Sequence, residues 1–168
     1  PTSSRRQRQM CIRDSGLQIA TIEFCRNVLG MEGANSTEFE DNPEHAAVVF
    51  MPEISKTHLG GTMRLGSRPT LWQHEGSTIR ELYGPGDAVD ERHRHRYEVN
   101  PDLIHSIESE GLVFVGKDES GQRCEIFELN DHPYYVGVQF HPEFKSRPGR
   151  PSPPFLGLLK AASGQLNR

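Results

Sequence analysis

The sequence lacks any long hydrophobic run. Its apolar stretch at 46–51 is far shorter than the roughly 20 residues that a helix needs to cross a bilayer. An excess of positive charge is missing as well, because 19 Lys and Arg stand against 23 Asp and Glu and leave a formal net charge of −4. Such a charge gives no general attraction to nucleic acid or to an anionic membrane. We therefore expect neither as a partner. The expected location of the protein is the cytoplasm.

Cysteine is also scarce. The three cysteines, Cys11, Cys25 and Cys124, form no C-x-x-C pair. An odd and sparse set argues against a disulfide framework and a structural zinc site, and it suits a reducing compartment. Cys25 falls on the apolar stripe of a predicted helix and Cys124 in a predicted strand, so we expect both in the core.

Residues 1–15 differ in composition from the rest of the chain. They hold four arginines, one acid and almost nothing apolar, so they cannot bury enough surface to offset the entropy of ordering. We expect a disordered or non-native tail. The same composition can mark an organellar transit peptide, but the run QMCIRDS also resembles translated adapter sequence at the end of an incomplete transcript, and we favour that interpretation.

Residues 16–168 form a single expected domain in which helix and strand patterns mix. Thr78 with Glu81 predicts a capping box, and Asn100 before Pro101 and Asp102 predicts a helix start. The predicted helices lie at 17–28, 78–83, 101–110 and 154–162, and the predicted strands at 46–51, 61–66, 70–72, 112–116, 123–129 and 134–140, with a turn at 67–69. This mixture favours an α/β fold, a layered open sheet with flanking helices.

Residues 137–143, GVQFHPE, concentrate the candidate chemistry. An apolar strand delivers His141 at its end, where the loops of an open α/β sheet gather ligands. Pro142 forces a bend, and Glu143 can then fold back to hydrogen bond one imidazole nitrogen. This contact would leave the other nitrogen to act as a base. When a single His and Glu occur at this spacing, however, they more commonly form a surface pair without a catalytic role.

The run ERHRHRYEVN allows several interpretations. As a strand it would alternate between two faces, with Arg92, Arg94 and Arg96 on one and His93, His95, Tyr97 and Val99 on the other. His-x-His could ligate a metal, but nothing nearby in the sequence supplies obvious further ligands, so we expect no metal site. An RNA-binding stripe would need more aromatic residues. A solvated, charged strand is the plainest alternative.

GVQFHPE resembles the His/Glu segment of the triad-type, class I glutamine amidotransferases, whose third member is a cysteine on a strand-to-helix elbow. Four further segments are similar to CTP synthases in particular: GANSTEF (33–39), GGTMRLG (60–66), ERHRHRYEVNP (91–101) and KSRPGRPSPPFLGLL (145–159). The resemblance covers 16 to about 165, and the Ser-Arg-Pro run and PSPPF are similar to the eukaryotic type.

The resemblance implies a glutaminase domain. In that family a cysteine thiolate attacks the side-chain amide of L-glutamine, and the released ammonia travels to a separate synthetase domain, where ATP-phosphorylated UTP is aminated to CTP. His141 then matches the general base and Glu143 its orienting partner. Gln18, Glu38 and Arg96 match the positions that hold glutamine. The family implies no cofactor in this domain, ATP and Mg in the synthetase domain, and a homo-oligomer of the full-length enzyme.

The sequence departs from the family at the nucleophile. In the family pattern Gly-x-Cys-x-Gly-x-Gln, Gln18 fixes the cysteine at position 14, where this chain has Asp14. Cys11 lies three residues early among bulky side chains, and the elbow needs small neighbours. We expect the chain to be an N-terminally incomplete glutaminase domain, without its first strands or an intact elbow, that is inactive alone. The alternative is a non-catalytic binding or assembly module.

Overall fold

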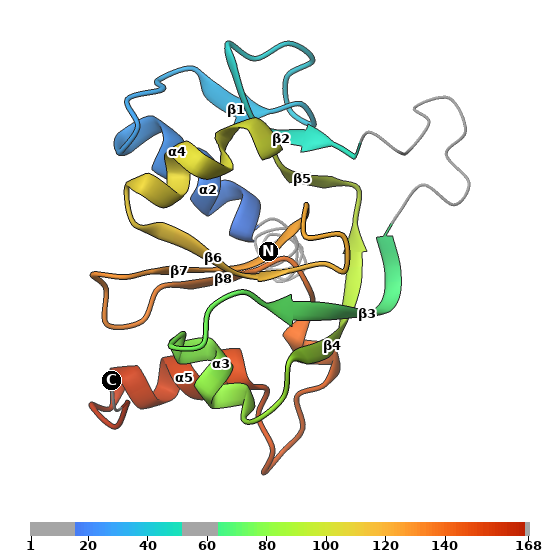
Figure 1. Ribbon diagram of the computed structural model, residues 1–168, viewed down its shortest axis with the longest axis vertical. Coiled ribbons are helices and arrows are strands. Elements are labelled where there is room, and N and C mark those ends of the chain that lie inside the picture. Colours follow the sequence, from blue (N-terminus) through green and yellow to red (C-terminus); the bar gives the residue numbers. More distant parts are fainter. Residues whose placement is uncertain (1–15, 52–63, 167–168) are drawn as a thin grey trace, which may run out of the picture.

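The computed structural model describes residues 16–51 and 64–166 (Figure 1). Its helices are α2 (Gly16–Asn27), α3 (Thr78–Tyr83), α4 (Ile104–Ser109) and α5 (Pro153–Ala162), with 3-10 turns η1 (Pro101–Leu103) and η2 (Pro142–Phe144). Its strands are β1 (Ala34–Ser36), β2 (His45–Phe50), β3 (Arg64–Trp72), β4 (Ala88–His95), β5 (Tyr97–Val99), β6 (Leu112–Lys117), β7 (Cys124–Leu129) and β8 (Val136–Val138). The tail at 1–15 lies outside the described residues.

The strands form two sheets. The larger has the order β4-β3-β6-β7-β8 with antiparallel neighbours, and the smaller has the order β1-β2-β5. Although β4 and β8 lie at opposite edges of the larger sheet, the His141 N–H, just beyond β8, donates to the Arg92 carbonyl of β4 at 2.8 Å. The larger sheet therefore curls until its two edges meet. The predicted class, an α/β sheet with flanking helices, is confirmed.

Helices cover both faces of the larger sheet because its central strands are apolar on both sides. On β6, Phe114 packs into a core with α2 and α4, whereas the next residue, Val115, packs with Ile79 of α3. Figure 1 shows α2 and α4 on one side of β6–β8 and α3 with α5 on the other. Cys25 and Cys124 are both buried, as expected. None of the helices in the described ranges is long and apolar enough to cross a membrane.

Two local predictions were wrong. The expected turn at 67–69 does not exist, because β3 runs without a break from Arg64 to Trp72 and pairs with β4 along that length. The cap of α3 is Ser77, whose side chain accepts from Arg80 N–H, rather than Thr78. The start at Asn100 is confirmed, since its side chain accepts from the Asp102 N–H at 3.1 Å.

Candidate active site

His141 and Glu143 form a close pair directly after β8. The backbone bond to Arg92 fixes the position of His141, and Pro142 starts the 3-10 turn η2, which brings Glu143 back toward the ring. His141 Nδ1 lies 3.0 Å from Glu143 Oε1, and the His141 side chain is nearly buried. The contact favours the tautomer with the proton on Nδ1, so that Nε2 carries the lone pair that a general base needs.

Gln18, Glu38 and Arg96 are brought together around Tyr97. Gln18 Nε2 donates to the Tyr97 carbonyl at 2.9 Å. Burial raises the pKa of the Tyr97 hydroxyl, the charge of Glu38 raises that pKa further, and the charge of Arg96 lowers it. The side chains of Glu38 and Arg96 therefore both lie close enough to act on one hydroxyl group. That these three residues hold glutamine remains a prediction.

A cavity of about 310 Å³ connects the start of α2 with the His–Glu segment. Gly16 and Leu17 of α2 line it together with Gly137 of β8, and Pro142 and Glu143 complete the wall. Gly16, the first described residue of the chain, and Glu143 thus line the same cavity.

Both described cysteines are free thiols buried in the core. Burial raises the pKa of the Cys25 thiol to about 11 and that of Cys124 to about 12, so neither is a thiolate at neutral pH. Asp14, at the expected nucleophile position, and Cys11 both lie outside the described residues.

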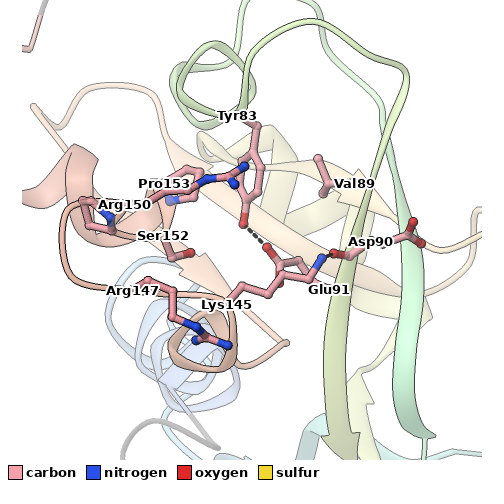
Figure 2. Close-up of a pocket in the computed structure, with 10 residues that line it drawn as sticks. Tyr83, Val89, Asp90, Glu91, Lys145, Arg147, Arg150, Ser152 and Pro153 are labelled. Atoms are coloured by element: carbon pink, nitrogen blue, oxygen red, sulfur yellow. Dashed lines mark hydrogen bonds between the residues drawn. The ribbon is translucent and has the colours of Figure 1, made fainter.

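A larger cavity, of about 530 Å³, contains none of the predicted site residues. Figure 2 shows Tyr83 and Glu91 pointing toward one another in it, with the Tyr83 hydroxyl donating to Glu91 Oε1 at 2.7 Å. Burial raises the pKa of both groups. Lys145 Nζ donates to the Asp90 carbonyl at its edge. We assign no catalytic role to this cavity, because its buried acid is already paired with a phenol.

Sequence reasoning missed the acid that contacts the paired histidines. Glu125 is fully buried on β7, next to His93 and His95. A signal was available, since a carboxylate inside the apolar run CEIFEL needs a buried partner. The sequence could not say which one, because the partners lie on β4, which β3 and β6 separate from β7 in the sheet.

Known proteins resemble this chain in sequence and in fold. The sequence profile of "Glutamine amidotransferase class-I" matches residues 15–161. CTP synthase 2 of Saccharomyces cerevisiae is 60% identical over 157 residues, which are 90% of this chain and 27% of the yeast protein. CTP synthase 1 of Homo sapiens is 57% identical over 152 residues, 90% of this chain and 26% of the human protein.

A solved structure agrees with these relatives. It is described as "Trypanosoma brucei CTPS - glutaminase domain with bound acivicin". Its TM-score to this chain is 0.83 at 34% sequence identity, over 91% of this chain and 59% of that one.

The matched profile spans most of the sequence, so the chain belongs to the class I glutamine amidotransferase family. Within that family, its similarity is to the glutaminase domain of CTP synthases. The chain spans about a quarter of the length of these CTP synthase relatives.

Proposed function

We propose that this chain is most of the glutaminase domain of a CTP synthase, the domain that supplies ammonia for the ATP-dependent amination of UTP, and that it is inactive alone because Asp14 stands at the nucleophile position. The observation that carries the proposal is the His141–Glu143 pair, 3.0 Å apart and beside the cavity that the start of α2 also lines. A nucleophile at a helix start, a His base and an acid that orients it make up the apparatus of amide hydrolysis through an acyl-enzyme.

The proposed chemistry assigns one task to each group. His141 Nε2 takes the proton from the nucleophile and returns it to the leaving ammonia, while Glu143 stabilises the imidazolium that forms between these steps. Arg96 clamps the α-carboxylate of glutamine, Glu38 accepts from its α-ammonium group, and Gln18 completes the substrate site.

The remaining parts of the proposal concern the whole protein. Ammonia would pass to a synthetase domain of the same protein, in which ATP and Mg²⁺ would be bound. We assign no described residue to either cofactor. A homo-oligomer and a cytoplasmic location are proposed for the full-length enzyme from the resemblance to CTP synthases.

A chimera tests the proposal. Residues 16–165 of this chain replace the matching segment of the 60% identical yeast relative, whose own sequence then supplies the elbow and the synthetase part. We expect CTP formation from glutamine at a rate within about tenfold of the parent. A chimera that makes CTP from ammonia but not from glutamine would favour the alternative, a non-catalytic module.

An assay of the unsubstituted chain, outside any chimera, is the complementary test. With Asp14 at the nucleophile position we expect no glutamate release above a buffer blank, because a carboxylate cannot form the thioester. Release that a Cys11→Ala substitution abolishes would instead assign the nucleophile to Cys11.

A further inference from the structure

Three buried side chains of metal-binding type converge on one point between β4 and β7. His93 and His95 come from β4 and Glu125 from β7, and one ligand atom of each lies within 4.8 Å of the others. All three are nearly inaccessible to solvent. In the described ranges, this is the one group of three such residues that could hold an ion. The curl of the sheet creates it, since β4 and β7 are not neighbours.

Hydrogen bonding alone leaves this cluster unsatisfied. His93 Nδ1 lies 3.1 Å from His95 Nε2 and 3.1 Å from Glu125 Oε2. One ring nitrogen carries either one proton or one lone pair, so these two contacts compete for it. Glu125 Oε2 has no hydrogen-bond partner among the described residues, so a buried polar atom is left unpaired.

A single cation would satisfy all three ligand atoms at once. Ligands at about 2.0–2.2 Å from a tetrahedral zinc ion lie roughly 3.3–3.5 Å from one another. The two 3.1 Å separations are close to that spacing. An imidazole binds metal through the lone pair of a ring nitrogen, so both histidines would act as neutral ligands.

Acidic side chains and their arginine partners surround the cluster. Arg64 contacts Glu125 Oε1 at 3.2 Å, which leaves Oε2 directed at the histidines. Arg64 and Arg123 also face two further acids, Asp118 and Glu98. Three acidic side chains thus lie beside these two guanidinium groups.

An outer contact also holds one of the ligands in place. Arg64 orients the Glu125 carboxylate from its far oxygen. Partners of this kind are found behind most metal-binding histidines and carboxylates, where they fix the ring tautomer and the aim of the carboxylate.

We propose that His93, His95 and Glu125 bind one divalent transition-metal ion, with Zn²⁺ the best fit, as a structural site that joins β4 to β7. Two imidazole nitrogens and one carboxylate oxygen suit zinc better than the oxygen-preferring Mg²⁺ or Ca²⁺. Because Arg92, between Glu91 and His93 on β4, holds the backbone of His141, the ion would also stiffen the strand behind the candidate base.

Cobalt is the probe that tests the site, because its visible absorption reports coordination geometry. The full chain is freed of metal with a chelator and titrated with Co²⁺ at neutral pH. We expect about one Co²⁺ per chain, intense visible bands typical of tetrahedral coordination, no sulfur-to-metal charge-transfer band, and displacement by Zn²⁺. Zn²⁺ should also raise the thermal unfolding midpoint.

Variants assign the ligands. His93→Gln and Glu125→Gln should each weaken Co²⁺ binding at least tenfold, whereas His105→Gln, at an exposed position on α4, should not change it. Substoichiometric binding by the unsubstituted chain, weak octahedral bands or a thiolate charge-transfer band would each overturn the proposal. These three results need no variant, so they decide the matter even if a substituted chain fails to fold.

Discussion

Arg96 occupies the break between two strands. β4 ends at His95 and β5 begins at Tyr97, so Arg96 belongs to neither strand, and its carbonyl accepts from the Met51 N–H at 3.1 Å. Its side chain is half-buried, and its Nε finds no hydrogen-bond partner among the described residues. A half-buried guanidinium with an unpaired N–H group can donate hydrogen bonds to the carboxylate of a ligand.

Substitution of Arg96 should therefore affect glutamine binding more than chemistry. The α-carboxylate of glutamine keeps its charge during amide cleavage, so a contact to it lowers KM without altering kcat. In the chimera, Arg96→Ala should raise the KM for glutamine about ten- to a hundredfold, the effect of losing about 1.5–3 kcal/mol of charge-assisted bonding. Steady-state kinetics with glutamine measures this.

Arg96→Lys is the matched variant. It should recover only part of the loss, because an ammonium group cannot reproduce the planar fork of a guanidinium. The rate with ammonia should stay unchanged in both variants. An unchanged KM together with a lower melting temperature would make Arg96 a structural residue of the strand break.

At the residue scale, sequence spacing predicted contacts that are local in the chain. Glu143 lies two residues from His141, so the pair followed from the bend at Pro142 alone. The neighbours of His93 could not be predicted in this way. Glu125 is 32 positions away in sequence, and only the curl of the sheet brings the two residues together.

At the scale of elements, proline and serine suggested a turn that packing overrides. Ser67 and Pro69 are common turn residues, yet both lie inside β3. Proline cannot donate to a ladder, but β3 pairs with β6 only at Leu71 and Trp72. On that side of Pro69 no strand pairing is lost, so the long antiparallel pairing with β4 continues.

Gly157 determines how α5 packs. A Cβ at this position would lie 2.5 Å from Leu82 Cδ1 of α3 and 2.5 Å from the Tyr134 ring, which its hydroxyl ties to the Pro154 carbonyl at 2.8 Å. Gly→Ala within a helix normally stabilises by about 1 kcal/mol. Here we expect Gly157→Ala to lower the free energy of unfolding by about 1–3 kcal/mol, because overpacking outweighs helix propensity. Urea unfolding measures the change.

Gly76→Ala is the control for this prediction. A Cβ at Gly76 would meet nothing within 4 Å, so its effect should stay within about 0.5 kcal/mol. Should Gly157→Ala stabilise the chain instead, α5 would not be packed against α3 and Tyr134 as closely as these distances require.

The buried histidines of β4 and the buried Glu125 of β7 should make the free energy of unfolding of the metal-free chain depend on pH. His93 and His95 have folded pKa values of about 2 and about 3, well below the ordinary 6.5, so the unfolded chain binds more protons as the pH falls below 6.5. Glu125 acts in the opposite sense, because its folded pKa of about 8 lies above the ordinary 4.5. As the pH falls from 6.5 to 4.5, the two histidines lower the free energy of unfolding by about 4–5 kcal/mol, and Glu125 raises it by about 2 kcal/mol.

We therefore expect the metal-free chain to lose about 2 kcal/mol of unfolding free energy over that range. Urea unfolding at several pH values measures the loss. Glu125→Gln should steepen it to about 4 kcal/mol, since glutamine takes up no compensating proton. His105→Gln should leave it unchanged. A constant stability between pH 6.5 and 4.5 would mean that the two histidines are not held neutral in the folded chain.

At the scale of the whole molecule, the candidate site depends on segments far apart in the sequence. α2 begins at Gly16 and η2 starts at Pro142, yet both line one cavity. The fold class followed from the mixture of patterns along the chain, whereas the curl that brings β4 to His141 is a property of the assembled sheet. The chain also spans only about a quarter of the length of its CTP synthase relatives, so the proposed formation of CTP requires the rest of the enzyme.

Substitution of His141 should separate the two half-reactions of the chimera. If His141 is the base for glutamine hydrolysis, His141→Ala should lower CTP formation from glutamine by about 10²–10⁴-fold, the usual contribution of general acid–base catalysis. CTP formation from added ammonia should remain within about twofold, because that reaction bypasses the glutaminase site. Parallel assays of one preparation with each nitrogen source measure the ratio directly.

Glu143→Gln refines the same experiment. The amide side chain introduced at position 143 keeps a hydrogen-bond acceptor near His141 Nδ1 but loses the charge that stabilises the imidazolium. The rate of CTP formation from glutamine should therefore fall less than in His141→Ala. Phe155→Ala, at a partly exposed position on α5 that lines the same cavity, tests whether a change of the wall alone is harmful. A parallel fall of both activities in His141→Ala would contradict the assignment. In that case His141, anchored to β4 through Arg92, would hold the curled sheet together rather than act on glutamine.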